Sequence, residues 1–227
     1  MIRRTMLTTI RNAAAVAAIA LAFPAMAGAA DTISGKPSDT EAAFVAKITA
    51  DLTARFPTPD AARKAGYMRY TDEDDTGAIS YANLRWTSVD AAHPSQLWFD
   101  VKDRLIGADY SVPKTGDKPP ADLFGLRPER WQDFHAHVHY ALATPTGTTY
   151  GGAGAKTMAK GGGSITNPTA NALVAAGIAK KASDVRFVFA FPAIWDTAIW
   201  LVPNPDGAFA EKNPDVKPAK PPKEMKM

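Results

Sequence analysis

The pattern of apolar and polar positions begins with a stretch of helical periodicity. Apolar side chains recur at three- and four-residue spacing at Ala43, Phe44, Ile48, Leu52 and Phe56. Ser38 or Asp39 is suited to cap this helix, and Glu41 lies in its first turn. Pro59, a favoured first-turn residue, begins a second short helix that ends by Gly66. The N-terminal part of the chain is therefore predicted to be helical.

From about residue 79 the pattern alternates with period two, which is typical of half-buried strands. The sequence predicts strands over 79–86, 96–101, 105–110, 185–191 and 197–202. The second and third of these are joined by a three-residue turn and form a hairpin. A later helix is predicted from Asn167-Pro168 to Gly177, and the glycine-rich stretch 147–163 is predicted to be a loop.

These elements predict an α+β fold. We expect an antiparallel sheet of five to six strands, with the N-terminal helices packed on it and one later helix. Residues 31–205 suit a single domain of ordinary apolar content. Residues 206–227 are rich in proline and lysine, and they are predicted to form a disordered tail.

Residues 1–30 have the layout of a secretory signal peptide. Three arginines precede an apolar run from Ala13 to Phe23, which is followed by small residues suited to cleavage. The segment Arg3-Arg4-Thr5-Met6-Leu7 loosely resembles a twin-arginine export signal, so the export route stays open. The apolar run is too short to span a membrane. The sequence therefore predicts a soluble periplasmic or secreted protein.

The charge balance argues against nucleic-acid and membrane partners. Three of the 26 basic residues lie in the predicted signal peptide, so the mature chain has as many basic as acidic residues. A protein with no net charge has no global field to attract nucleic acid or anionic lipid. The chain also has no cysteine, so any metal site must use nitrogen, oxygen or thioether ligands.

The densest candidate chemistry lies between Phe134 and Tyr140. Three of the four histidines of the chain, His135, His137 and His139, occupy alternate positions there. On a β-strand they would share one face, with apolar side chains on the other. Three imidazoles on one face indicate metal ligation. This HxH arrangement resembles the metal-binding strands of cupins and carbonic anhydrases over about five residues, and the resemblance implies a geometry rather than a family.

Strand geometry limits how many of these histidines can bind one ion. Neighbouring same-face Cα atoms lie about 6.6 Å apart and the outer two about 13 Å apart. With metal–nitrogen bonds of about 2 Å, two neighbours can converge but all three cannot. The chelating pair is either His137 with His139 or His135 with His137. The other ligands must come from elsewhere, and the candidates are His93, Asp100, Asp109, Glu129 and Asp133.

A helical register is the alternative for this stretch. Trp131, Phe134 and Val138 also fit helical spacing, and a helix would place His135 and His139 on one face with His137 pointing away. We favour the strand from residue 136 onward, because Val138, Tyr140 and the Thr-Pro-Thr-Gly that follows suit a strand and its turn.

Two functions follow as hypotheses. In the first, the exported protein binds a divalent transition metal (copper, zinc or nickel, with copper or zinc as the expected cofactor) as a binding protein or a metal-dependent enzyme. Its predicted metal residues are His135, His137, His139 and His93. In the second, a non-enzymatic periplasmic module binds a small apolar ligand or a protein partner, and the histidines are only structural. A cavity ringed by Trp98, Trp195 and Trp200 would favour the second hypothesis.

Overall fold

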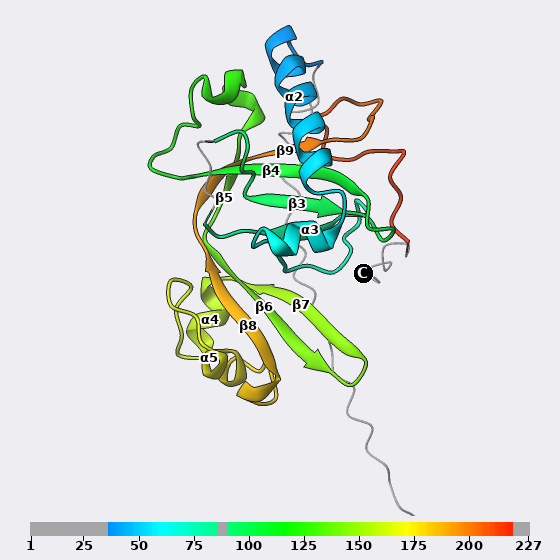
Figure 1. Cartoon of the computed structure of the whole chain (residues 1–227). Helices are drawn as coiled ribbons and strands as arrows, with labels where there is room; N and C mark the ends of the chain where they lie inside the picture. Colours follow the sequence, from blue (N-terminus) through cyan, green and yellow to red (C-terminus); the bar gives the residue numbers. More distant parts are fainter. Residues whose placement is uncertain (1–35, 86–89, 220–227) are drawn as a thin grey trace, which may run out of the picture.

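Two antiparallel sheets organise the chain in the computed structural model, which describes residues 36–85 and 90–219 (Figure 1). The larger sheet has six strands in the order β1-β2-β3-β4-β9-β5. Its strands are β1 (Met68–Arg69), β2 (Ile79–Ala82), β3 (Gln96–Phe99), β4 (Leu105–Pro113), β5 (Gln132–Phe134) and β9 (Ile194–Trp200). The smaller sheet has the order β7-β6-β8, formed by β6 (His137–Thr144), β7 (Gly147–Ala153) and β8 (Val185–Phe191). The predicted α+β class with a six-stranded antiparallel sheet is confirmed.

Four α-helices and three 3-10 helices accompany the sheets within the described ranges. They are α2 (Asp39–Arg55), α3 (Pro59–Lys64), α4 (Ala155–Lys160), α5 (Ala170–Ala175), η1 (Leu123–Gly125), η2 (Pro128–Arg130) and η3 (Ala182–Asp184). None of the described helices is long and apolar enough to cross a membrane. The predicted signal peptide, residues 1–30, lies outside the described residues.

Helix α2 covers one face of the larger sheet. It begins at a capping box, in which the Ser38 hydroxyl accepts from the Glu41 amide and the Glu41 carboxylate accepts from the Ser38 amide. The side chains of Phe44, Ile48 and Leu52 follow at four-residue spacing and are buried in the main core, together with residues of β3, β4 and β9. Figure 1 shows α2 lying across this sheet, whereas α4 and α5 lie beside the smaller sheet.

The chain passes between the two sheets twice, at neighbouring places. Strand β5 pairs with β9, and after residues 135–136 the chain continues as β6, which pairs with β8. Strand β8 is in turn joined to β9 by Pro192 and Ala193 alone. The two sheets therefore meet at a junction that consists of the start of β6 and the end of β8, and this junction positions the histidines.

The smaller sheet was not predicted, because its strand β7 falls in the glycine-rich stretch 147–163. That stretch forms β7 and then α4, so the predicted loop is wrong. Gly151 accommodates the ring of Tyr140 on the neighbouring strand, since a Cβ at Gly151 would lie 2.5 Å from the Tyr140 Oη. Glycine marks a close side-chain approach at this position and not a break in the strand. Helix α4 is also additional to the single later helix that the pattern predicts.

The C-terminal segment packs on the protein over part of the predicted tail. Residues 206–219 are described, and Phe209, Ala210 and Val216 among them are buried. Trp200 Nε1 donates to the Ala210 carbonyl at 2.8 Å. Isolated apolar residues between the prolines and lysines supply this packing, so the disorder predicted from residue 206 does not hold for this part. Residues 220–227 lie outside the described residues.

Gly107 on β4 makes room for the ring of Trp98 on β3. A Cβ at Gly107 would lie 2.1 Å from Trp98 Cε3, so a Gly107→Ala protein must displace the ring. The displacement would also break the hydrogen bond from Trp98 Nε1 to Asp109. We expect Gly107→Ala to lower the free energy of unfolding in urea by about 1–3 kcal/mol. The matched control is Gly116→Ala, where a Cβ meets nothing within 4 Å, and an equal loss in the two proteins would contradict this account.

Candidate functional site

Strand β6 brings the imidazoles of His137 and His139 into contact at the sheet junction. The two residues form the histidine pair, whose Nε2 atoms lie 2.9 Å apart. They oppose Phe191 and Phe189 on β8, so all four side chains share one face of the smaller sheet. On the other face, Val138 is buried in a core with α4 and α5. The predicted strand register from residue 136 is confirmed, and the helical alternative is wrong.

Aromatic rings surround the histidine pair. The ring of Tyr70, the residue that follows β1 of the larger sheet, meets His139 edge-on at a centroid distance of 4.6 Å. Phe191 stacks on His137 at 5.0 Å with an interplanar angle of 29°, and Phe189 lies 5.6 Å from His139. The pair therefore lies between the two sheets in a largely apolar environment.

This environment keeps the histidine pair neutral. Burial, together with the proximity of His137, lowers the pKa of His139 to about 3. Burial also lowers the pKa of His137, against a hydrogen bond to a backbone carbonyl that raises it. That bond joins His137 Nδ1 to the His135 carbonyl at 2.7 Å. It fixes the proton on Nδ1, so His137 Nε2 is the acceptor in the contact with His139 Nε2.

The other predicted metal residues do not join the pair. The His135 side chain is 89 % exposed, and its Nδ1 lies 3.8 Å from Asp133 Oδ1. His93 contacts Asp90 at 2.5 Å and lines a separate hollow beside Arg55. Within the described residues, no group of three or more His, Asp or Glu side chains could hold a metal ion. The structure thus brings two of the four predicted histidines together.

The remaining carboxylate candidates have other partners or positions. Asp100 caps the β3–β4 turn, where it accepts from the amides of Lys102 and Arg104 at 2.9 and 3.0 Å. Asp133 pairs with Lys114. Glu129 lies in the short helix η2, before β5.

A second polar cluster is buried on the larger sheet. Asp109 on β4 and Asp196 on β9 form the carboxyl pair, hydrogen-bonded to each other and each 5 % exposed. Asp109 also accepts from Trp98 Nε1 at 2.8 Å. Ser111 Oγ donates to Asp196 at 2.5 Å and lies 2.6 Å from Ser95 Oγ, so these two serines form a hydroxyl pair next to the carboxyls.

The carboxyl pair shares a proton. Burial raises the pKa of Asp109 well above its usual range, and the charge of Asp196 raises it further. Burial also raises the pKa of Asp196, to about 7, against the lowering effect of the hydrogen bonds from Ser111 and Asp109. Two carboxyls this close and this buried cannot both ionise at low cost, so above the pKa of Asp196 it is Asp109 that holds the proton and Asp196 that carries the charge.

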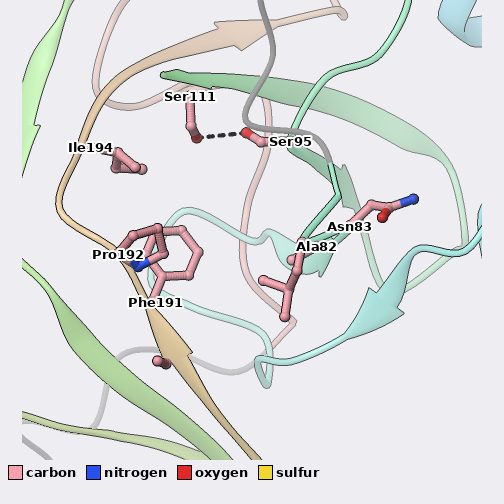
Figure 2. Close-up of a pocket in the computed structure, with 9 residues that line it drawn as sticks. Ala82, Asn83, Ser95, Ser111, Phe191, Pro192 and Ile194 are labelled. Carbon is pink, nitrogen blue, oxygen red and sulfur yellow. Dashed lines mark hydrogen bonds between the residues drawn. The ribbon is translucent and has the colours of Figure 1, made fainter. Parts of the chain in front are cut away.

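The hydroxyl pair opens onto a cavity between the sheets (Figure 2). This junction cavity has a volume of about 110 Å³. Its polar lining consists of Ser95, Ser111 and Asn83. Its apolar lining consists of Ala82, Leu84, Ala190, Phe191, Pro192 and Ile194. Because Phe191 also stacks on His137, one ring separates the histidine pair from the cavity.

The tryptophans of the second hypothesis do not ring a cavity. Trp98 packs edge-on against Trp200 at 5.4 Å, in a core that also contains Val216. Trp195 is buried in the main core, on the opposite face of the sheet. The small-ligand hypothesis therefore receives no support at the place where the sequence located it.

The sequence patterns do not identify Asp196 or the hydroxyl pair as candidate site residues. Asp196 lies in the middle of an apolar strand, and aspartate is almost never fully buried unless it is paired. A single aspartate in an apolar strand indicates that a polar side chain lies buried against it. The sequence does not say which one, because Asp109 is 87 positions away from Asp196 in the chain. The comparisons with known proteins found no matching family model, no matching curated protein and no matching solved structure.

Proposed function

We propose that the protein binds a divalent transition-metal ion through Nε2 of His137 and Nε2 of His139. The observation that carries this proposal is the 2.9 Å separation of the two nitrogens. With metal–nitrogen bonds of about 2.0 Å, it corresponds to a nitrogen–metal–nitrogen angle of ~90°. Adjacent positions at this angle suit the tetragonal nitrogen and oxygen sites that copper(II) and nickel(II) prefer. Tetrahedral zinc requires a separation of about 3.3 Å, which a small ring movement would supply.

The protonation state of the pair supports the proposal. Metal ligation requires a neutral imidazole, and burial lowers the pKa of both histidines, so both rings are already neutral at neutral pH. The bond from His137 Nδ1 to the His135 carbonyl is the kind of outer contact that orients a metal-binding imidazole. In the absence of metal, His139 Nε2 donates a hydrogen bond to His137 Nε2, and this proton moves to Nδ1 of His139 when both Nε2 atoms bind a metal.

Two protein ligands leave the remaining coordination positions to solvent or to a further molecule. This arrangement is compatible with a metal-binding protein and with a metal-dependent enzyme, since catalysis needs an open position. Location outside the cytoplasm is part of the same proposal and rests on the character of residues 1–30. N-terminal sequencing of the exported protein tests it, with a mature start between residues 28 and 31 as the expected result.

A metal titration of the untagged protein tests the site. Calorimetry with copper(II), nickel(II) and zinc(II) should give about one equivalent bound per chain, with a rise in melting temperature. His137→Ala should weaken binding more than about 100-fold, because even the loss of an outer contact to a ligand costs 10–100-fold. His139→Ala should do the same.

The chain offers matched controls in its other two histidines. His135→Ala and His93→Ala remove imidazoles outside the pair, and they should leave the affinity within about threefold of the wild type. If the wild-type protein bound less than about a tenth of an equivalent of metal, with no shift in melting temperature, the proposal would be wrong. The contact between His137 and His139 would then be a hydrogen bond without a role in metal binding. Equal losses in all four variants would place the bound metal elsewhere.

A further inference from the structure

We propose that the junction cavity binds a small organic cation, a primary ammonium group on a short apolar chain, with the ammonium against the hydroxyls of Ser95 and Ser111. The site is separate from the histidine pair and does not depend on metal binding. Its walls supply one polar end and one apolar end, as Figure 2 shows for Ser95 and Ser111 on one side and Phe191 and Pro192 on the other.

The hydrogen-bond directions in the hydroxyl pair decide which kind of ligand group can bind there. Ser111 gives its proton to Asp196, and the Ser95 proton goes to Ser111 or to the Asp109 carbonyl at 3.0 Å. Both hydroxyl protons are therefore used within the protein, and only oxygen lone pairs remain for a ligand. A bound group must donate hydrogen bonds. An anion would meet these lone pairs and, behind them, the charge of Asp196.

The charge behind the hydroxyls favours a cation over a neutral donor. Once Asp196 ionises, the carboxyl pair carries one negative charge, and within residues 36–85 and 90–219 no ion pair includes Asp109 or Asp196. A buried charge normally has a counter-charge, because its desolvation is costly. An ammonium bound at the hydroxyl pair would supply the counter-charge to Asp196, with only the Ser111 hydroxyl between the two charges.

The size and the lining of the cavity define the rest of the ligand. A volume of about 110 Å³ has room for about four water molecules, and thus for an organic molecule of about four or five non-hydrogen atoms. Ala82, Ile194 and Phe191 offer it an apolar surface. Propylammonium meets both requirements, whereas larger amines would have to displace Phe191 or Pro192.

The test is an NMR titration of the ¹⁵N-labelled full chain at constant ionic strength with three probes of four or five non-hydrogen atoms: propylammonium, propan-1-ol and propionate. We expect saturable shifts of the Ser95 and Ser111 amides with propylammonium. We expect at least tenfold weaker binding of propan-1-ol, and no binding of propionate. No saturable response to propylammonium, or an alcohol or a carboxylate that binds as tightly, would overturn the proposal.

Three variants locate the binding. Ala82→Leu fills the cavity without touching the hydroxyls and should abolish the response. Ser111→Ala should weaken the binding of propylammonium at least tenfold, whereas Ser164→Ala, which replaces an exposed serine, should leave it unchanged. Binding that survives Ala82→Leu unchanged would refute the site. Should a buried variant fail to fold, the ranking of the three probes on the wild type still decides the question.

Discussion

Replacing Glu41 by glutamine should lower the free energy of unfolding by about 3–5 kcal/mol, the loss expected when one partner of a buried ion pair is removed. Glu41 is fully buried, and its carboxylate accepts from Arg130 Nε at 3.0 Å, Arg127 Nε at 3.1 Å and the Ser38 amide at 2.9 Å. Arg130 is 1 % exposed. Glutamine has nearly the same shape but leaves the guanidinium of Arg130 without this counter-charge.

The pKa of Glu41 supports the same expectation. Burial acts to raise it, but the hydrogen bonds from Arg130, Ser38 and Arg127 lower it to about 2. A carboxyl with a lowered pKa contributes stability above its unfolded value of 4.5, and the contribution is lost as the pH falls towards 2. The bonds thus outweigh the cost of burying the charge.

Urea unfolding at pH 7 measures the effect of Glu41→Gln. The control is Asp51→Asn on the same helix, where Asp51 pairs with Arg55 at 2.6 Å but is 42 % exposed. An exposed pair of this kind contributes at most about 1 kcal/mol. If the two variants lost equal stability, Glu41 would not be the anchor between α2 and the segment that leads into β5.

Replacing Asp196 by asparagine should make the protein progressively more stable relative to the wild type as the pH rises. The folded pKa of Asp196 is about 7 against an ordinary value of 3.8, so between these values the folded chain holds a proton that the unfolded chain has released. Stability then falls as the pH rises through this window. At about 1.4 kcal/mol per pKa unit, the difference between pH 4 and pH 8 is roughly 4 kcal/mol.

Asparagine does not titrate, and its amide can accept from Ser111 and donate to Asp109. Urea unfolding of both proteins at pH 4, 6 and 8 measures the difference between them. The difference isolates the carboxyl pair from His137 and His139, whose lowered pKa values add stability as the pH rises to about 6.5 and remain in both proteins. Exposed Asp117→Asn serves as the control. A difference that does not change with pH would show that folding does not raise the pKa of Asp196.

The elements that the sequence predicted well are those with a local cause. Helix α2 follows from a cap at Ser38 and apolar residues every four positions. Strand β8 was predicted at its observed ends, residues 185–191, because its residues favour strands on both faces. The histidine face of β6 also followed from period two. Each of these signals is contained within fewer than twenty residues.

The sequence does not predict in the same way which histidine contacts His137 or which strands pair. His137 pairs with His139 and not with His135, because β6 begins at residue 137 and His135 lies in the link from β5, where the alternation of faces ends. The junction cavity and the carboxyl pair depend on β9 pairing with β4. No local pattern specifies that contact, since Ser111 and Asp196 lie 85 residues apart.

Strand β9 is also the last strand within the described residues, and both of its neighbours are made long before it. Until residues 194–200 leave the ribosome, β4 has an unpaired edge along seven residues, and β5 lacks β9, its one strand partner in the described part of the chain. Long-range pairing of this kind is slow to form, and an open apolar edge is prone to pair with other chains. A chain that ends before residue 194 should therefore aggregate during synthesis, and the nascent protein should need a chaperone until its C-terminal segment is complete.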